Sequence, residues 1–313
     1  MNANSRDSAL DRCQEQLSEC PRRTALTSHR FADGQSMRVR GKRHTTMALR
    51  DILVMLDGSV QSATRLQIAV SLAQRDAAYL IGFCALNMMQ PGGHPGVEIS
   101  IAEETERIKT EFRNRLRFAG LQGEWRETTD NVSEALAHRM RHVDLTILGQ
   151  VDQNHPPPAG RHLIEDVLLT GGRPILVIPY VGRFETLGTN VLVGWNNSRE
   201  ATRALNDAIP LIANNASVLV LEAYTIGSKS ASDDTTSGEA ASHLTRHGFN
   251  AKTALTALTG VSASDVLLSY AADVSADLLV VGGYGHSRLR ELVLGGVTRE
   301  LLQHMTLPVL MSH

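Results

Sequence analysis

The stretch that decides the fold lies near the end of the chain and reads Leu278-Leu279-Val280-Val281-Gly282-Gly283-Tyr284-Gly285. Four apolar residues followed at once by glycines predict a buried strand that ends in a tight loop. A second glycine pair, Gly295-Gly296, precedes a helix-like segment at residues 298–305. A strand, a glycine loop and a helix N-terminus commonly hold phosphate, because unpaired N–H groups and the helix dipole point at the anion. The stretch therefore predicts a nucleotide-binding loop.

The chain after Met47 repeats itself, which indicates two copies of one structural unit. The matching segments are 51–59 with 190–198, 144–149 with 277–282, and 173–177 with 307–311. Within each copy, short β-branched runs alternate with helical patterns, which predicts parallel strands joined by crossover helices. Continuous apolar strands indicate that helices cover both faces of the sheet. We predict two tandem α/β domains, at residues 47–182 and 186–313.

Composition excludes several classes of protein. Of the 313 residues, 42% are apolar and 20% are charged, which is typical of a globular protein. No apolar run reaches the length of a membrane span and no secretory signal is visible, so we expect a cytoplasmic protein without a membrane partner. Cys13, Cys20 and Cys84 have neither metal-ligand spacing nor a disulfide pattern.

Charge is distributed unevenly along the chain. Residues 1–46 carry nine Lys or Arg and five Asp or Glu, whereas the remainder carries 22 and 28. An acidic body argues against general nucleic-acid binding. We expect residues 1–46 to be a disordered or non-native leader, with Met47 as an alternative start of translation.

Taken together, the glycine loop, the repeat and the Leu307-Pro308-Val309-Leu310 ending resemble tandem universal stress protein domains over about residues 47–313. In that family each domain is a five-stranded parallel sheet of the adenine nucleotide alpha hydrolase-like fold, and nucleotide-binding members carry Gly-x2-Gly-x9-Gly-(Ser/Thr). Gly282, Gly285 and Gly295 match this spacing, whereas Gly296 replaces the Ser or Thr. The resemblance implies a stress-response regulator that binds ATP, ADP or AMP, with or without Mg²⁺. It also implies a pseudo-dimer of the two domains within one chain and leaves a further homodimer open.

The candidate nucleotide-binding residues are Trp195, Asn196, Ala223, Val281, Gly282, Gly285, Arg288, Gly295, Gly296, Val297 and Thr298. The resemblance implies that Asn196, in place of the family's acidic residue, and a backbone amide at Ala223 would contact adenine. The glycine-loop amides would hold the phosphates, and Thr298 would supply the hydroxyl that Gly296 lacks. Arg288 is a candidate phosphate clamp. Trp195 has two readings, stacking on a base or packing on its own sheet.

The first domain has a degenerate form of the same site. It keeps an acidic residue, Asp57, but residues 150–158 after its fourth strand lack the glycines and include three prolines, which have no N–H to donate. We therefore expect the nucleotide mainly in the C-terminal domain.

Several residues have a structural reading beside the functional one. One of Asn196, Asn197 and Ser198 is expected to cap the following helix. The pairs His138 with His142 and His243 with His247 have helical metal-ligand spacing, but the sequence suggests no third ligand, so we expect no metal site.

Two other functions stay open. One is a stress-response scaffold that binds no nucleotide and acts through protein contacts. The other is a slow nucleotide-hydrolysing or adenylating enzyme. Because the chain has no Gly-x4-Gly-Lys-(Ser/Thr) and no evident general base, we expect no catalytic residues and at most slow ATP hydrolysis.

Overall fold

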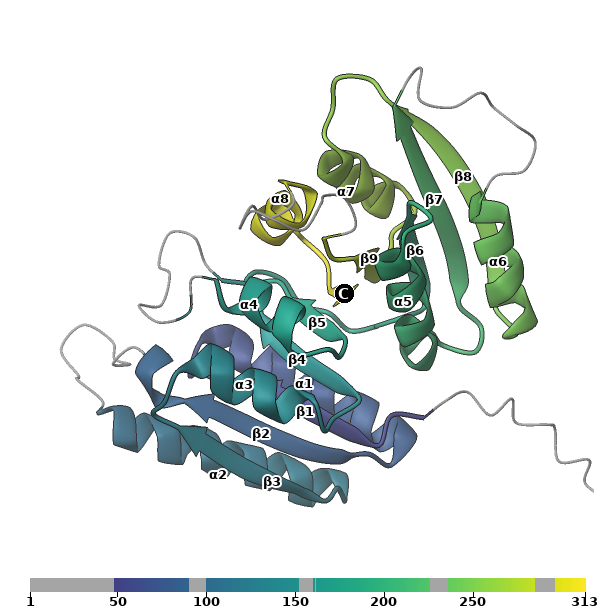
Figure 1. The fold of residues 1–313 in the computed structure, drawn as a ribbon. Helices are drawn as coiled ribbons and strands as arrows, with labels where there is room; N and C mark the ends of the chain where they lie inside the picture. Colours follow the sequence, from purple (N-terminus) through teal and green to yellow (C-terminus); the bar gives the residue numbers. More distant parts are fainter. Residues whose placement is uncertain (1–47, 90–99, 152–159, 161, 226–235, 285–295) are drawn as a thin grey trace, which may run out of the picture. The chain divides into compact units, whose positions relative to one another are not determined.

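The computed structural model describes residues 48–89, 100–151, 160, 162–225, 236–284 and 296–313. Strands and helices alternate along these residues, as the repeated pattern predicts (Figure 1). The expected leader, residues 1–46, lies outside the described part of the chain.

In the first half of the described chain, five strands alternate with four α-helices, and a short 3₁₀ helix, Leu86–Met88, follows β2. Its elements are β1 (Asp51–Met55), α1 (Val60–Asp76), β2 (Tyr79–Ala85), α2 (Ile101–Ala119), β3 (Gly123–Thr128), α3 (Val132–Met140), β4 (Leu145–Gly149), α4 (Leu163–Thr170) and β5 (Ile175–Ile178).

The second half repeats this order. Its elements are β6 (Asn190–Trp195), α5 (Arg199–Ala208), β7 (Ser217–Thr225), α6 (Thr236–Arg246), β8 (Asn250–Leu258), α7 (Ala263–Asp273), β9 (Leu278–Gly282), α8 (Gly296–His304) and β10 (Val309–Ser312). The helix α8 begins two residues before the predicted segment at 298–305.

The described strands form one sheet in the order β3-β2-β1-β4-β5-β10-β9-β6-β7-β8. Each half contributes five strands that run parallel to one another. The two halves join at β5 and β10, which pair antiparallel from Val177 with Val309 to Ile175 with Met311. The predicted α/β fold of five-stranded parallel sheets is therefore present in each half.

Alternate residues of the strands belong to two hydrophobic cores, one on each face of the sheet. Ile52 and Val54 pack with helices α1, α2, α5 and α6, whereas Leu53 and Met55 pack in the cluster that holds α3, α4, α7 and α8. In the view of Figure 1, α3 and α4 lie in front of the first-half strands. Both faces are covered, as continuous apolar strands require.

Candidate functional site

The carboxyl edges of β6 and β9 adjoin in the second half. The two strands pair in parallel from Val191 with Leu278 to Gly194 with Val281. Strand β7 lies on the other side of β6, so the chain leaves β6 in one direction and returns to its opposite side at β9. Such a reversal of strand order is where open α/β sheets bind ligands. The turn after Trp195 and the start of the glycine segment are therefore neighbours, which the sequence alone could not establish.

The turn after β6 is an Asx turn that leads into a capped helix. Asn196 Oδ1 accepts the Ser198 N–H at 3.2 Å, and Asn197 has a φ of 57°. Ser198 Oγ accepts the Ala201 N–H at 3.1 Å and caps α5. The expected cap role thus falls to Ser198. Asn196 is exposed. Its side-chain oxygen accepts the Ser198 N–H, and the same amide group also carries N–H donors.

The same turn recurs in the first half. Asp57 Oδ1 accepts the Ser59 N–H at 3.1 Å, and Gly58 has a φ of 75°. Both halves therefore build the turn after their first strand from an Asx acceptor and a left-handed residue. This match confirms that Asp57 and Asn196 are equivalent positions.

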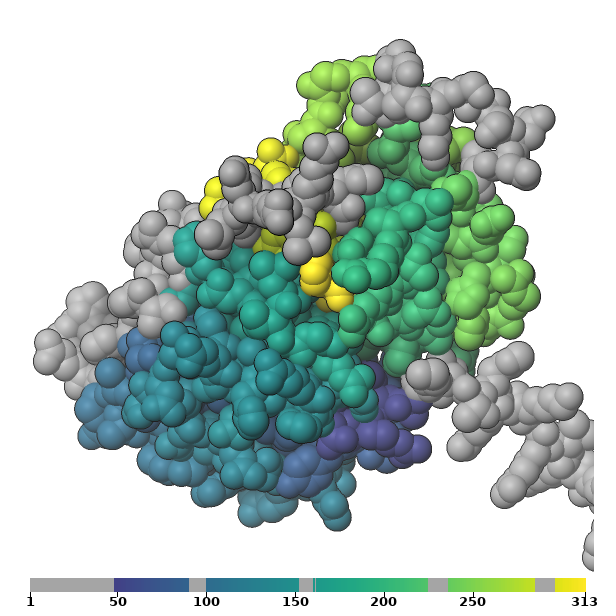
Figure 2. All heavy atoms as spheres, in the orientation of Figure 1, coloured from purple at the N-terminus to yellow at the C-terminus, as the bar shows by residue number. Residues whose placement is uncertain are grey.

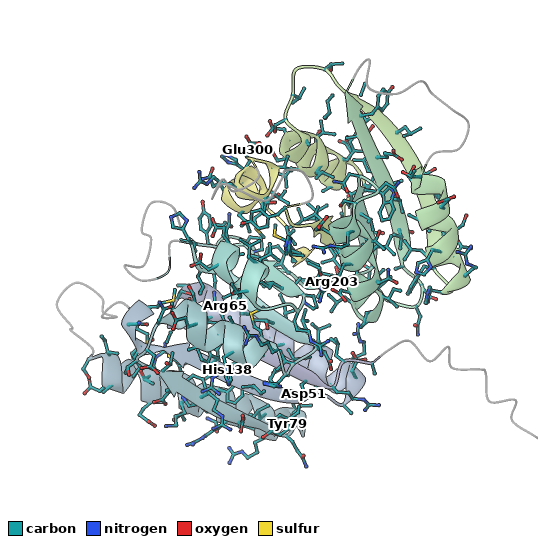
Figure 3. All side chains as sticks on the ribbon, in the orientation of Figure 1. Asp51, Arg65, Tyr79, His138, Arg203 and Glu300 are labelled. Atoms are coloured by element: carbon teal, nitrogen blue, oxygen red, sulfur yellow. The ribbon has the colours of Figure 1, made fainter. Side chains whose placement is uncertain are left out.

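Asp57 is already engaged by a buried arginine, Arg65 of α1 (Figure 3). Arg65 is 2% exposed, and its Nη2 lies 2.5 Å from Asp57 Oδ1 while its Nε donates to the Met55 carbonyl at 2.9 Å. Burial raises the pKa of the Asp57 carboxyl, but the Arg65 charge and the hydrogen bonds from Ser59 outweigh burial and hold this pKa below its usual value. The first-half carboxylate is thus neutralised within the protein.

The second half has no counterpart of Arg65. Counting from Asp57 and Asn196, the equivalent residue is Ala204, which is buried on α5. A Cβ added to Gly149, at the end of β4, would collide with the Arg65 guanidinium. A Cβ added to Gly282, at the end of β9, would instead collide with the α5 backbone at Glu200 and Ala201. The helix α5 therefore rests directly on β9, where a guanidinium separates helix and strand in the first half.

Trp195 is a packing residue in this structure. Its side chain is 9% exposed and belongs to the core, and its Nε1 donates to Thr236 Oγ1 at 3.2 Å. Thr236 in turn donates to the buried carboxylate of Glu222, which also accepts the Ser237 N–H at 3.1 Å. Of the two readings of Trp195, the structure favours packing over stacking on a ligand.

Ala223 and Val281 lie on the two strands that flank this edge. Ala223 follows Glu222 on β7, is half-buried and pairs with Thr256 of β8. Val281 is 7% exposed in the hydrophobic core. Ala223 is therefore placed where its backbone faces the edge beyond β6, whereas the Val281 side chain serves the core.

The first glycines of the loop have packing roles. Besides Gly282 against α5, the Gly283 N–H donates to the Ser312 carbonyl at 2.8 Å, and a Cβ on Gly283 would lie 2.6 Å from Leu168 of α4. Figure 2 shows the end of the chain, in yellow, against α5, where Ser312 Oγ donates to Asp207 at 2.9 Å. The Gly283 amide is therefore committed to the sheet.

Tyr284 follows with a φ of 62°, a conformation uncommon for a residue with a side chain. The centroids of the Tyr284 and His313 rings are 6.0 Å apart, in an edge-to-face arrangement. The Tyr284 hydroxyl is buried without a hydrogen-bond partner in the described part of the chain. Burial, together with the charges of Glu165 and Asp166, raises the pKa of Tyr284. The residue is held against α4 as a neutral phenol.

The start of α8 is exposed. Gly296 and Val297 are exposed, and a Cβ on Gly296 would meet no atom of the described residues within 4 Å. Thr298 is buried at 6% exposure. Farther along the helix, Glu300 accepts a hydrogen bond from Ser264 of α7 at 2.5 Å (Figure 3). The other loop candidates, Gly285, Arg288 and Gly295, lie outside the described residues.

In the first half the position after β4 is occupied by Gln150, which ties the halves together. Gln150 is 7% exposed, and its Nε2 donates to the carbonyls of Leu302 at 2.8 Å and Gln303 at 3.2 Å. Its Oε1 accepts the Tyr180 N–H at 3.1 Å. Nothing in the local sequence marks Gln150, because Leu302 and Gln303 are distant in the chain, or Arg65, because a lone arginine on a helix is usually exposed.

Within the described ranges, no group of three or more His, Cys, Asp or Glu side chains is arranged around a common metal position. None of the described helices is both long and apolar enough to cross a membrane. Cys84 is a buried free thiol, and burial raises its pKa to about 12. It is therefore protonated and unreactive at neutral pH.

Comparison with known proteins finds similarity to universal stress proteins. The profile of the Universal stress protein family matches residues 189–313. A universal stress protein of Synechocystis sp. is 29% identical over 206 residues, which cover 63% of this chain and 68% of that protein.

Two solved structures share the fold over most of the chain. A universal stress protein from Archaeoglobus fulgidus matches with a TM-score of 0.62 at 15% identity, covering 86% of this chain and 97% of that one. A functionally unknown protein from Pseudomonas aeruginosa matches with a TM-score of 0.58 at 17% identity, covering 85% and 92%. The C-terminal part of the chain, residues 189–313, therefore matches the universal stress protein family.

Proposed function

We propose that the C-terminal half binds an adenine nucleotide at the carboxyl edge of β6 and β9, and that the protein acts as a cytoplasmic stress-response regulator. The observation that carries the proposal is the start of α8. The N–H groups of a helix's first turn have no partner within the helix, and the exposed Gly296 and Val297 present this turn beside open space. Such a turn attracts phosphate.

The base would lie over the Asx turn of the same half. Asn196 is exposed there, and its amide offers both donors and an acceptor to the adenine edge. The backbone at Ala223 would supply a further contact. Gly285, Gly295 and Arg288 belong to the proposal as phosphate ligands through the sequence pattern, and Mg²⁺ would accompany ATP.

We assign the nucleotide to the second half because the first half has lost the same features. Asp57 is paired with Arg65, so a ligand would have to compete with an internal ion pair. Gln150, where the second half has Gly283, is held by three hydrogen bonds. In this proposal residues 47–182 and 186–313 are tandem domains that pair as a pseudo-dimer, and one chain binds one nucleotide.

Isothermal titration with ATP, ADP and AMP tests the proposal, with Gly296→Asp and Gly296→Ala as a matched pair of variants. Both side chains have room at this position, and only Asp adds a charge that repels phosphate. We expect Gly296→Asp to weaken ATP binding at least about tenfold, and Gly296→Ala to change it less than about threefold. Equal affinities in the two variants, or no binding below about 1 mM in the wild type, would overturn the proposal.

A second function is favoured by one observation. Gly282 and Gly283 are both explained by packing, the first against α5 and the second against Leu168. The glycine segment would then be a feature of the fold, and the protein would act as a scaffold through protein contacts. This alternative predicts protein that purifies without nucleotide and a melting temperature that ATP does not change.

A further inference from the structure

Two histidines lie one turn apart at the end of α6: His243 is in its last turn, and His247 directly follows the final residue, Arg246. Residues at i and i+4 lie on one face of a helix, and here the ring centroids are 4.6 Å apart with the rings tilted by 61°. His247 is exposed and His243 half-buried, so both rings are open to ions from solvent. Paired imidazoles at this spacing suit Zn²⁺, Ni²⁺ and Cu²⁺.

A third donor comes from a different helix. Asn206 of α5 places its Oδ1 at 3.2 Å from His243 Nε2. Its Nδ2 donates to the Thr202 carbonyl at 2.8 Å, which fixes the amide so that the oxygen faces the histidine. Two donors that each lie about 2.1 Å from one ion at a tetrahedral angle are about 3.4 Å apart. The gap between Oδ1 and Nε2 therefore has the width that a shared ion requires.

The protonation state of His243 is also suitable. Burial lowers its pKa, and the nearby His247 and Arg246 lower it further. A lowered pKa favours the neutral ring, which is the form that binds a metal ion. Because an amide oxygen only accepts, Nε2 carries the ring proton in the metal-free state, and that proton would move to Nδ1 when Nε2 takes an ion.

We propose that Asn206, His243 and His247 form a surface site for one divalent first-row transition-metal ion, which bridges α5 and α6. All three residues lie near the C-terminal ends of their helices. Helices in such a sheet run antiparallel to the strands, so the site lies at the amino edge, opposite the proposed nucleotide. The sequence alone suggests no third ligand for this histidine pair, and Asn206 of α5 supplies one.

The other histidine pair provides the control. His138 and His142 are also four residues apart, but their ring centroids are 6.0 Å apart, and within the described residues no side-chain oxygen is hydrogen-bonded to either ring. This pair lacks the third donor that defines the proposed site.

The test is titration of the full chain with Zn²⁺ alone. Three variants address the site: His243→Ala with His247→Ala, Asn206→Ala, and Asn206→Asp. We expect the double histidine variant to lose one bound ion per chain. Asn206→Ala should lower the affinity for that ion about tenfold. Asn206→Asp should raise the affinity by a similar factor, since a carboxylate is the stronger ligand. The control variant, His138→Ala with His142→Ala, should keep the wild-type site.

Apart from the substituted residues, the wild type and the variants carry the same histidines and cysteines. A difference in the number of bound ions therefore reports the substituted site. Ring resonances of His243 and His247 should shift in the NMR spectrum as the ion binds. A double histidine variant that retains every ion would overturn the proposal. Equal affinity in wild type, Asn206→Ala and Asn206→Asp would also overturn it, because the amide would then not be a ligand.

Discussion

At the scale of single residues, Arg65 decides how the two halves differ. Its guanidinium fills the space over Gly149 and neutralises Asp57, whereas Ala204 leaves α5 in direct contact with β9. A buried arginine is stable only when its donors are satisfied. The Arg65 side chain thus explains why the equivalent turns at Asp57 and at Asn196 have different surroundings.

Arg65→Met is predicted to destabilise the protein by about 3 kcal/mol, because it leaves the Asp57 carboxylate without its buried partner. The double variant Arg65→Met with Asp57→Asn should recover part of this loss, since no unpaired charge remains. Urea unfolding of the two variants measures both effects. A double variant no more stable than Arg65→Met would show that the ion pair is not the cause.

The pH dependence of stability follows from the same pair. The pKa of Asp57 is lower in the folded protein than its ordinary value of 3.8, so the stability it contributes is fully present above about pH 4. That contribution is lost as pH falls through the folded pKa. The difference in unfolding free energy between wild type and Asp57→Asn should therefore shrink below pH 4. A difference that grows on acidification would contradict the assigned direction.

At the scale of elements, the contact of α5 with β9 requires a glycine at position 282. A Cβ there would lie 2.5 Å from the Glu200 carbonyl carbon, so the helix would have to move. Gly282→Ala is predicted to cost about 1–3 kcal/mol by overpacking. Gly296→Ala, which has open space, should change stability by less than about 0.5 kcal/mol. Similar losses in the two variants by urea unfolding would refute this account of Gly282.

Gln150 of the first half contacts helix α8 of the second half. Gln150→Leu leaves the α8 carbonyls of Leu302 and Gln303 and the Tyr180 N–H without this partner, at a cost of about 1–3 kcal/mol. Gln74 is a matched control, because it is exposed and makes one weak bond, to Ala119 at 3.3 Å. Gln74→Leu should be nearly neutral in the same unfolding assay. An equal effect of both changes would exclude the bridging role.

How much of this was predictable depends on the range of the contacts. The strands and their order of appearance followed from apolar runs and the internal repeat, since these signals are local. The end of α5 is less evident from the sequence, because the α-helix stops at Ala208 and the chain continues as a 3₁₀ turn that contains Pro210. Arg65 gave no signal, because a lone arginine on a helix is usually exposed. Two of the three partners of Gln150, Leu302 and Gln303, lie 152 and 153 residues away.

At the scale of the whole molecule, the antiparallel pairing of β5 with β10 makes one sheet from two repeats. If the halves are a pseudo-dimer, residues 186–313 expressed alone should self-associate, because β10 would have an unpaired edge. Light scattering after size exclusion should give the mass of a dimer. A folded, monomeric fragment would show that β10 does not need a partner strand.

Native mass spectrometry of the full chain tests the central claim most directly, because it counts bound molecules. With ATP, ADP or AMP added, we predict one nucleotide per chain in the wild type and in Gly296→Ala, and none in Gly296→Asp at the same concentration. Two nucleotides per chain would show that Arg65 does not prevent nucleotide binding in the first half. No bound nucleotide in any of the three proteins would contradict a nucleotide site at the start of α8.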